Sequence, residues 1–143
     1  MKAQISARAA DGMPILAECG GFMYLQEFLE AADGKLFRMC GALPGTCRRT
    51  PRPVRFGYVE LTGKSGAAGY LQEGHRIRGH EFHYYDSTDN GDACEAAKPD
   101  GQRTWECMVV KGNIMAGFPH LYYRSDPAFA ENFVRACKAR KRS

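Results

Sequence analysis

The chain has 143 residues and a small net charge of +4, with 20 Lys and Arg against 16 Asp and Glu. This length suits one domain with a core of its own, and so small a charge excess does not indicate a nucleic-acid-binding protein. No run of about 18 apolar residues exists that could cross a membrane, and residues 1–12 lack the three regions of a signal peptide. We therefore expect a cytoplasmic protein that binds neither nucleic acid nor membrane.

The first part of the chain is predicted to run helix, strand, turn, helix. Residues 5–10 have helical composition, and residues 14–17 form a short apolar strand. Residues 19–21 (Cys-Gly-Gly) form a turn, after which apolar residues at helical spacing predict a helix over residues 22–32. The cysteine is therefore expected at a strand-to-helix turn.

The middle of the chain changes from helical period to period two. Alternation predicts strands over residues 56–61, 76–85, 104–110 and 114–118, and turn residues between the last two predict a hairpin.

Two segments are predicted as loops, and the chain is predicted to close with a helix. Residues 41–53 are rich in Gly, Pro and Arg and indicate a long loop whose arginines are solvated, while residues 88–102 indicate an exposed excursion. Ser125 and Asp126 before Pro127 are typical of a helix start. The final helix is expected to dock through one apolar face.

Cysteine and histidine spacing argues against a metal site. The sequence contains no C-x-x-C pair, the usual spacing of zinc ligands. His80 and His83 lie in an alternating segment, which would point the two rings to opposite faces of a strand. Because disulfides are rare in cytosolic proteins, we expect reduced thiols. The six cysteines are Cys19, Cys40, Cys47, Cys94, Cys107 and Cys137.

Cys19 is the candidate nucleophile. A thiol reacts as the thiolate, and a helix N-terminus lowers a thiol pKa, so the turn is expected to activate Cys19. Gly20 and Gly21 leave room for a substrate carbonyl, and the N–H of Gly20 can donate to a developing oxyanion. The alternative interpretation is a buried structural cysteine before a glycine-rich turn.

The candidate base is His120. It follows Pro119 at the end of a predicted strand, so its ring can be held at the sheet edge beside Cys19. His83 ranks second, because a histidine within a strand is more often structural. His80 shares that strand, and His75 lies in a turn.

Three separated motifs resemble the cobyrinic acid a,c-diamide synthase family. Residues 14–25 (PILAECGGFMYL) resemble its nucleophile segment, and residues 78–84 (RGHEFHY) resemble its second signature. Residues 39–45 (MCGALPG), with Phe-Gly-Tyr at 56–58, are similar to the stretch between them. The resemblance implies a class I glutamine amidotransferase-like α/β fold, a mixed sheet flanked by helices. It also implies that Cys19 hydrolyses glutamine through a thioester and that His120 is the catalytic histidine.

One position departs from that pattern. The residue two after the catalytic histidine is Glu in ordinary class I glutaminases and often His in this branch, whereas here it is Tyr122. The imidazole is then oriented by a backbone carbonyl, by Glu81 or by another acid. Glu81, His83 and Tyr122 are the accessory candidates.

The resemblance also implies a longer parent enzyme. No G-x-x-x-x-G-K-[ST] loop occurs, so residues 1–143 are expected to be the C-terminal part of an N-terminally truncated glutaminase domain. The ATP-binding synthetase domain, with its ATP and Mg²⁺, would then be absent, and this chain needs no cofactor. A glycine-rich loop that supplies a second oxyanion donor would be missing as well. Since losing one donor costs about 100- to 1,000-fold in turnover, the isolated chain is expected to be weakly active or inactive.

The expected partners are glutamine and a corrinoid acceptor. In the parent, ammonia would amidate the a and c carboxylates of cobyrinic acid in cobalamin biosynthesis, the corrinoid binding through the absent domain. A homodimer is left open. The alternatives are a glutaminase that serves another tetrapyrrole acceptor and a non-catalytic, glutaminase-like interaction domain.

Overall fold

The computed structural model describes residues 1–66 and 69–141, and the strands of this part form three sheets. The first sheet has the order β1 (Ile15–Glu18), β11 (Ile114–Gly117), β10 (Val109–Lys111). The second has the order β12 (His120–Leu121), β6 (Arg76–His83), β5 (Arg55–Gly63), β8 (Cys94–Ala97), β9 (Thr104–Cys107). The third has the order β3 (Leu36–Arg38), β2 (Phe28–Glu30), β4 (Thr46–Arg49), β7 (Tyr85–Ser87).

The first sheet is the one that positions the candidate nucleophile. β1 runs parallel to β11, in a register that places Glu18 opposite Gly117, and β10 pairs antiparallel with β11 as the predicted hairpin requires. All four residues of β11 are buried. Because β1 and β11 are parallel, their carboxyl ends meet at one edge of the sheet, and the segments that follow them lie together there.

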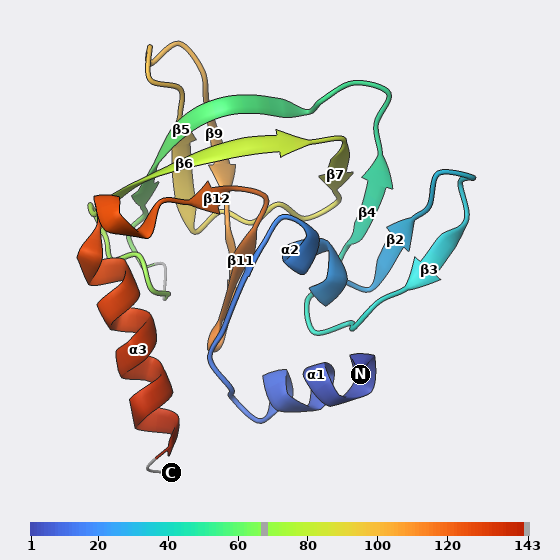
Figure 1. The fold of residues 1–143 in the computed structure, drawn as a ribbon, viewed down its shortest axis with the longest axis horizontal. Helices are drawn as coiled ribbons and strands as arrows, with labels where there is room; N and C mark the ends of the chain where they lie inside the picture. The colour runs from blue at the N-terminus through green and yellow to red at the C-terminus, as the bar shows by residue number, and fades with distance from the viewer. Residues whose placement is uncertain (67–68, 142–143) are drawn as a thin grey trace.

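Helices flank these sheets (Figure 1). They are α1 (Lys2–Ala10), α2 (Gly20–Leu25), α3 (Pro127–Lys141) and the 3-10 helix η1 (Tyr123–Ser125). α2 buries Phe22 and Leu25 in the core, and α3 buries Phe129. No helix in the described ranges is long and apolar enough to cross a membrane. Mixed sheets with helices around them confirm the predicted fold class.

The predicted helix over residues 22–32 is wrong beyond residue 25, after about one turn. α2 ends at Leu25, and Gln26 is extended, with φ −72° and ψ −177°. The Gln26 side chain is fully buried, and its amide nitrogen donates to Ser87 Oγ at 2.7 Å. β2 follows and pairs with both β3 and β4. Sheet pairing thus overrides a helical pattern that came from local spacing alone.

Both predicted loops contain strands, so these predictions are also wrong. Within residues 41–53, β4 pairs with β2 and β7, and within residues 88–102, β8 pairs with β5 and β9. Cys94 and Ala96 of β8 are buried. In β8 the two buried positions hold the small residues Cys94 and Ala96, which carry little of the apolar signal by which a strand is recognised from sequence.

Met108 divides the predicted strand over residues 104–110. Its φ of 68° is a left-handed conformation that few non-glycine residues adopt. β9 before it belongs to the second sheet, and β10 after it belongs to the first. This bend carries the chain from one sheet to the other.

Candidate active site

Cys19 lies between β1 and α2 in a strained backbone conformation. Its φ is 46° and its ψ is −108°, values that a residue with a side chain rarely adopts. The Cys19 N–H donates to the Gly117 carbonyl at 2.8 Å, and its own carbonyl accepts from Met23 N at 3.0 Å. A strained residue on a sharp strand-to-helix turn is the geometry of a nucleophile elbow, which exposes the nucleophile beside free helical N–H groups.

The environment raises the pKa of the Cys19 thiol, so the expectation of a lowered pKa is wrong. Burial is the largest cause, and the carboxylates of Glu81 and Glu18 raise the pKa further. A hydrogen bond from the Gly20 backbone lowers it, but only in part. α2 has six residues, and its short dipole does not outweigh burial next to two acids. Cys19 therefore rests as a thiol and needs a base.

The other cysteines divide into buried thiols and one exposed thiol. All six cysteines are free. Burial raises the pKa of Cys47 and of Cys94 to about 12. Cys137 on α3 is exposed. Cys19 is half-buried, and it is the cysteine placed at the elbow.

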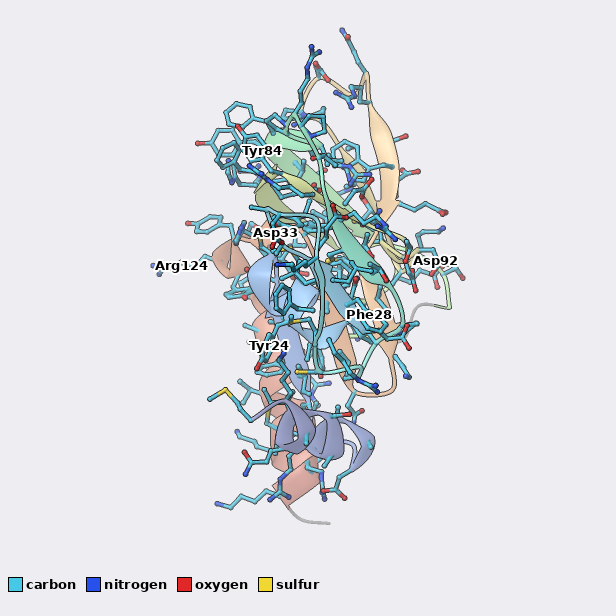
Figure 2. All side chains as sticks on the ribbon, turned by 90° about the vertical axis from the view of Figure 1, so that its right-hand side faces the viewer. Tyr24, Phe28, Asp33, Tyr84, Asp92 and Arg124 are labelled. Carbon is cyan, nitrogen blue, oxygen red and sulfur yellow. The ribbon has the colours of Figure 1, made fainter. Side chains whose placement is uncertain are left out.

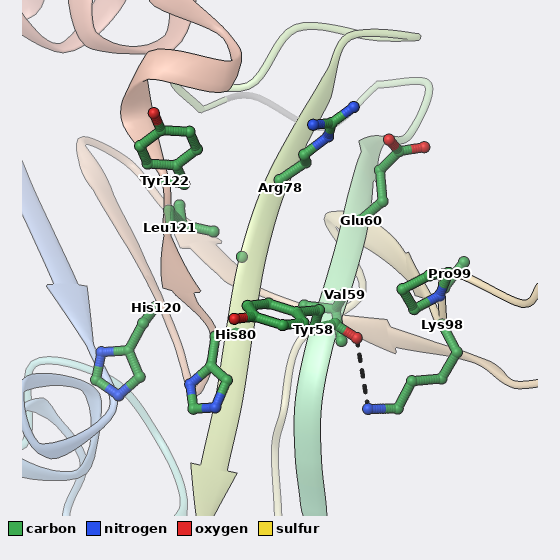
Figure 3. A pocket seen from close by; sticks show the side chains of 12 residues that line it. Tyr58, Val59, Glu60, Arg78, His80, Lys98, Pro99, His120, Leu121 and Tyr122 are labelled. Carbon is green, nitrogen blue, oxygen red and sulfur yellow. Dashed lines mark hydrogen bonds between the residues drawn. The ribbon is translucent and has the colours of Figure 1, made fainter.

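His120 begins β12, which pairs antiparallel with β6 and sets His120 opposite His80. The His120 side chain is 50% exposed, and its Nδ1 lies 3.8 Å from Glu18 Oε2. Figure 3 shows its ring beside the end of β1 and the start of α2. β1, the strand that directly precedes Cys19, thus also reaches the predicted base through Glu18. A direct contact between the Cys19 sulfur and the His120 ring stays a prediction.

Phe118 ties the His120 segment to the nucleophile helix. Its ring meets Phe22 of α2 edge-on, with ring centroids 5.2 Å apart, and stacks on His83 at 4.0 Å. Phe118, Pro119 and Phe22 are all buried. This packing fixes the backbone just before His120 relative to α2.

His83 and Glu81 form a buried pair that is separate from His120. The His83 Nδ1 lies 2.7 Å from the Tyr85 carbonyl, and Nε2 lies 2.8 Å from Glu81 Oε2. A carbonyl only accepts, so Nδ1 carries a proton, and Nε2 shares one with the carboxylate. Neither nitrogen of His83 is free to take the thiol proton. Trp105 Nε1 also donates to Glu81 at 3.2 Å, so Glu81 orients His83 rather than His120.

Sequence reasoning missed two side chains at this edge, Glu18 and Tyr123. Glu18 Oε1 accepts a hydrogen bond from the Tyr123 hydroxyl, while Oε2 faces His120. The signal was available, because Glu18 directly precedes the nucleophile on its strand. Tyr122, the residue at the departing position, is 58% exposed.

A cavity of about 810 Å³ opens beside His120 on the outer face of the second sheet (Figure 3). Arg78, Lys98 and the exposed ring of Tyr58 line it, together with His120 and Tyr122. Cys19 is not among its lining residues. The cavity therefore reaches the predicted base but not the predicted nucleophile.

Exposed aromatic rings continue along the strands at that end of the molecule. Phe56 and Phe82 have ring centroids 5.5 Å apart, and Phe82 meets Tyr84 at 5.6 Å. Figure 2 shows Tyr84 near the end opposite α1.

Within residues 1–66 and 69–141, no three His, Cys, Asp or Glu side chains are grouped to hold a metal ion.

Comparison with known proteins gives a family match over most of the chain. The profile of the family described as the CobB/CobQ-like glutamine amidotransferase domain matches residues 1–128. The cobyrinate a,c-diamide synthase of Priestia megaterium is 35% identical over 144 residues, covering 99% of this chain and 31% of that protein. The protein of the same name from Fusobacterium nucleatum is 39% identical over 125 residues, covering 84% of this chain and 26% of that protein. The chain thus spans less than a third of these curated relatives.

A solved structure supports the fold independently of sequence. The crystal structure of a GMP synthase subunit from Thermoplasma acidophilum matches with a TM-score of 0.56. The match covers 99% of this chain and 66% of that chain at 16% sequence identity. At this identity the likeness concerns the fold alone, and it agrees with the predicted glutamine amidotransferase-like architecture.

Proposed function

Because the chain belongs to the family of CobB/CobQ-like glutamine amidotransferase domains, we propose that it hydrolyses glutamine through a thioester on Cys19, with His120 as the general base. The observation that carries this proposal is the strained backbone of Cys19 on the turn between β1 and α2. A strained conformation persists where the surroundings enforce it, and such residues cluster at functional sites.

In the proposed reaction, His120 takes the thiol proton and the Cys19 sulfur attacks the amide carbon of glutamine. The carbonyl oxygen becomes an oxyanion that accepts a hydrogen bond from the Gly20 N–H. The C–N bond then breaks, and the imidazolium returns its proton to the nitrogen, so that ammonia leaves and a thioester remains. Attack by water on the thioester releases glutamate and restores the thiol.

The acceptor proposed for the ammonia is cobyrinic acid, at its a and c carboxylates. The supporting observation is that the relatives from Priestia and Fusobacterium are named cobyrinate a,c-diamide synthases. Those proteins are more than three times as long as the matched segment. Activation of the carboxylates with ATP and Mg²⁺, and binding of the corrinoid, would then be tasks of sequence outside this chain.

The test compares two nitrogen sources in the complete reading frame that carries this chain. Cys19→Ala is expected to abolish amidation with glutamine while amidation with ammonia persists, because ammonia bypasses the thioester. Cys137→Ala, which alters an exposed thiol on α3, is the matched control and is expected to keep both. Glutamine-dependent amidation by Cys19→Ala would contradict the proposal. A wild-type protein that uses ammonia alone would identify a non-catalytic domain.

A further inference from the structure

Glu18 and His120 face each other across the edge where β1 ends, with Oε2 and Nδ1 3.8 Å apart. We propose that Glu18 is the positioning residue for His120, and that it supplies the carboxylate which Tyr122 cannot. This inference rests on the proposed glutaminase function. It assigns the third member of the catalytic group to the residue that directly precedes the nucleophile.

The orientation of the ring matches that role. Nδ1 is the nitrogen that faces the carboxylate, which leaves Nε2 as the nitrogen available to the thiol. In a nucleophile–histidine–acid group, the acid accepts the Nδ1 proton and so keeps the Nε2 lone pair free for the proton of the nucleophile. A separation of 3.8 Å is longer than a hydrogen bond, but catalytic contacts are often long without substrate and tighten once it binds.

Tyr123 holds the carboxylate in place. Its hydroxyl donates to Glu18 Oε1, which leaves Oε2 for His120. The Tyr123 ring stacks on Phe129 of α3 at 5.7 Å and an interplanar angle of 6°, and Phe129 is 1% exposed. Burial, together with the bond to Glu18, raises the pKa of Tyr123, so its hydroxyl stays a donor at neutral pH. The buried start of α3 is thus linked through Tyr123 and Glu18 to His120.

The charges at this edge agree with proton transfer inside a compact group. Burial raises the pKa of the Cys19 thiol most, and the carboxylates of Glu81 and Glu18 raise it further, so an isolated thiolate is disfavoured at rest. The Glu18 carboxylate also faces the His120 ring, which takes the thiol proton in the proposed reaction. Glu18 is 20% exposed, so water screens this interaction only in part.

The other acid considered for this role is committed elsewhere. Glu81 accepts from His83 and Trp105, and the Arg55 guanidinium lies 4.0 Å from its carboxylate. It faces the buried side of β6, whereas His120 pairs with β6 through its backbone at His80. Glu18 is the carboxylate that the structure records beside the His120 ring.

The first test reads the protonated nitrogen of His120 by ¹⁵N NMR of the histidine-labelled chain at alkaline pH. The wild-type ring is expected to carry its proton on Nδ1. In Glu18→Ala the signal is expected to shift toward the Nε2-protonated form, because the acceptor is gone. Tyr123→Phe keeps the Glu18 carboxylate but removes the hydroxyl that holds it, so the His120 signal is expected to shift less. Glu106→Ala, which removes an exposed acid paired with Lys64, is the matched control and should leave His120 unchanged.

His83 is the internal reference in the same spectra. Both of its nitrogens are engaged within the second sheet, so its signals stay constant in any variant that keeps the fold. An unchanged His120 in Glu18→Ala, with an unchanged His83, would overturn the proposal. If the His83 signals also change in Glu18→Ala, Tyr123→Phe is the deciding variant. A signal shift confined to His120 in Tyr123→Phe supports the role of Glu18, and an unshifted His120 signal overturns it.

The second test measures glutamine hydrolysis by the complete reading frame. Glu18→Ala is expected to lower kcat about 10- to 100-fold, less than the roughly 10⁴-fold loss for a buried triad carboxylate, because water can partly orient a half-exposed ring. Glu18→Asp is expected to recover part of the loss. Full turnover in Glu18→Ala, in an enzyme that Cys19→Ala inactivates, would reject Glu18 and leave the proposed function standing. Turnover that survives Cys19→Ala would reject the function itself.

Discussion

His120 and His83 differ in burial and in the partners of their rings, and we expect their substitutions to fail in different ways. His120→Asn alters a half-exposed ring, so it should abolish glutamine hydrolysis and change the free energy of unfolding by less than about 0.5 kcal/mol. His83→Asn leaves Glu81 buried without its main partner, and breaking such a pair costs about 3 kcal/mol or more. Urea denaturation and a glutaminase assay on both variants separate the two roles.

The opposite pattern would reassign the base. If His83→Asn were stable but inactive while His120→Asn kept full turnover, His83 would be the proton acceptor. Its two bonded nitrogens would then have to rearrange when substrate binds.

The raised pKa of Cys19 sets its reactivity toward a general alkylating agent. At pH 7 we expect iodoacetamide to modify Cys137 first, because Cys137 is exposed whereas Cys19 is half-buried and protonated. Below its raised pKa, the alkylation rate of Cys19 should rise about tenfold per pH unit, since only the thiolate reacts. Peptide mapping between pH 7 and pH 9.5 measures both rates. Modification of Cys19 ahead of Cys137 at pH 7, with little dependence on pH, would mean that the thiol is already ionised.

At the scale of elements, the short strand β12 holds His120 against β6, and Gly79 allows that approach. A Cβ at Gly79 would lie 2.7 Å from the His120 carbonyl oxygen, so Gly79→Ala must displace β12. We expect glutamine hydrolysis to fall at least tenfold and stability to fall by about 1–3 kcal/mol.

Gly101→Ala is the matched control for that displacement. Gly101 has a φ of 71° and no atom within 4 Å of its added Cβ, so the substitution should cost about 1 kcal/mol of backbone strain and leave activity unchanged. Equal activity in Gly79→Ala and Gly101→Ala would show that the position of β12 does not matter for catalysis.

Elements with a strong local pattern could be predicted from sequence, and those formed by long-range pairing could not. The hairpin of β10 and β11 and the long strands β5 and β6 follow from alternation and turn residues. β2 and β8 were missed although each also pairs with the next strand along the chain, β2 with β3 and β8 with β9. Their other partners, β4 for β2 and β5 for β8, lie further along the chain and leave no trace in the local spacing.

The residues of the candidate site could be predicted from sequence only in part. Cys19 on a strand-to-helix turn follows from the glycines after a short apolar strand, and the structure agrees. Glu81 and His83 are two residues apart on β6, so the strand period alone places both on one face, but the burial of that face depends on what packs against it. The pairing of Glu18 with His120 required the parallel alignment of β1 and β11, which no short motif encodes.

At the scale of the whole molecule, buried thiols couple folding to alkaline pH. Burial raises the pKa of Cys47 and Cys94 from about 9 to about 12, and both side chains are essentially inaccessible. Below pH 9 both are protonated whether folded or unfolded, so their contribution to stability is fully present. Above pH 9 the unfolded thiols ionise while the folded ones do not, and stability falls by about 1.4 kcal/mol per pH unit for each thiol.

Urea denaturation between pH 8 and pH 10.5 measures this loss. The free energy of unfolding is expected to be flat up to pH 9 and to fall by roughly 2–3 kcal/mol by pH 10 if both thiols contribute. Cys94→Ala should make the free energy of unfolding fall less steeply with pH above pH 9. A stability that is constant to pH 10.5 would mean that these thiols are not buried in solution.

In the proposed reaction Cys19 attacks the side-chain carbonyl of glutamine, and covalent trapping of Cys19 is the sharpest test of that step. The protein is incubated with a glutamine analogue that carries an electrophilic carbon at the amide position, and its peptides are then mapped by mass spectrometry. We predict that the adduct forms on the peptide that contains Cys19 before any forms on exposed Cys137. Excess glutamine and the substitution His120→Asn are both expected to suppress it. An adduct on Cys137 or another cysteine, or a Cys19 adduct whose rate glutamine does not change, would contradict the claim.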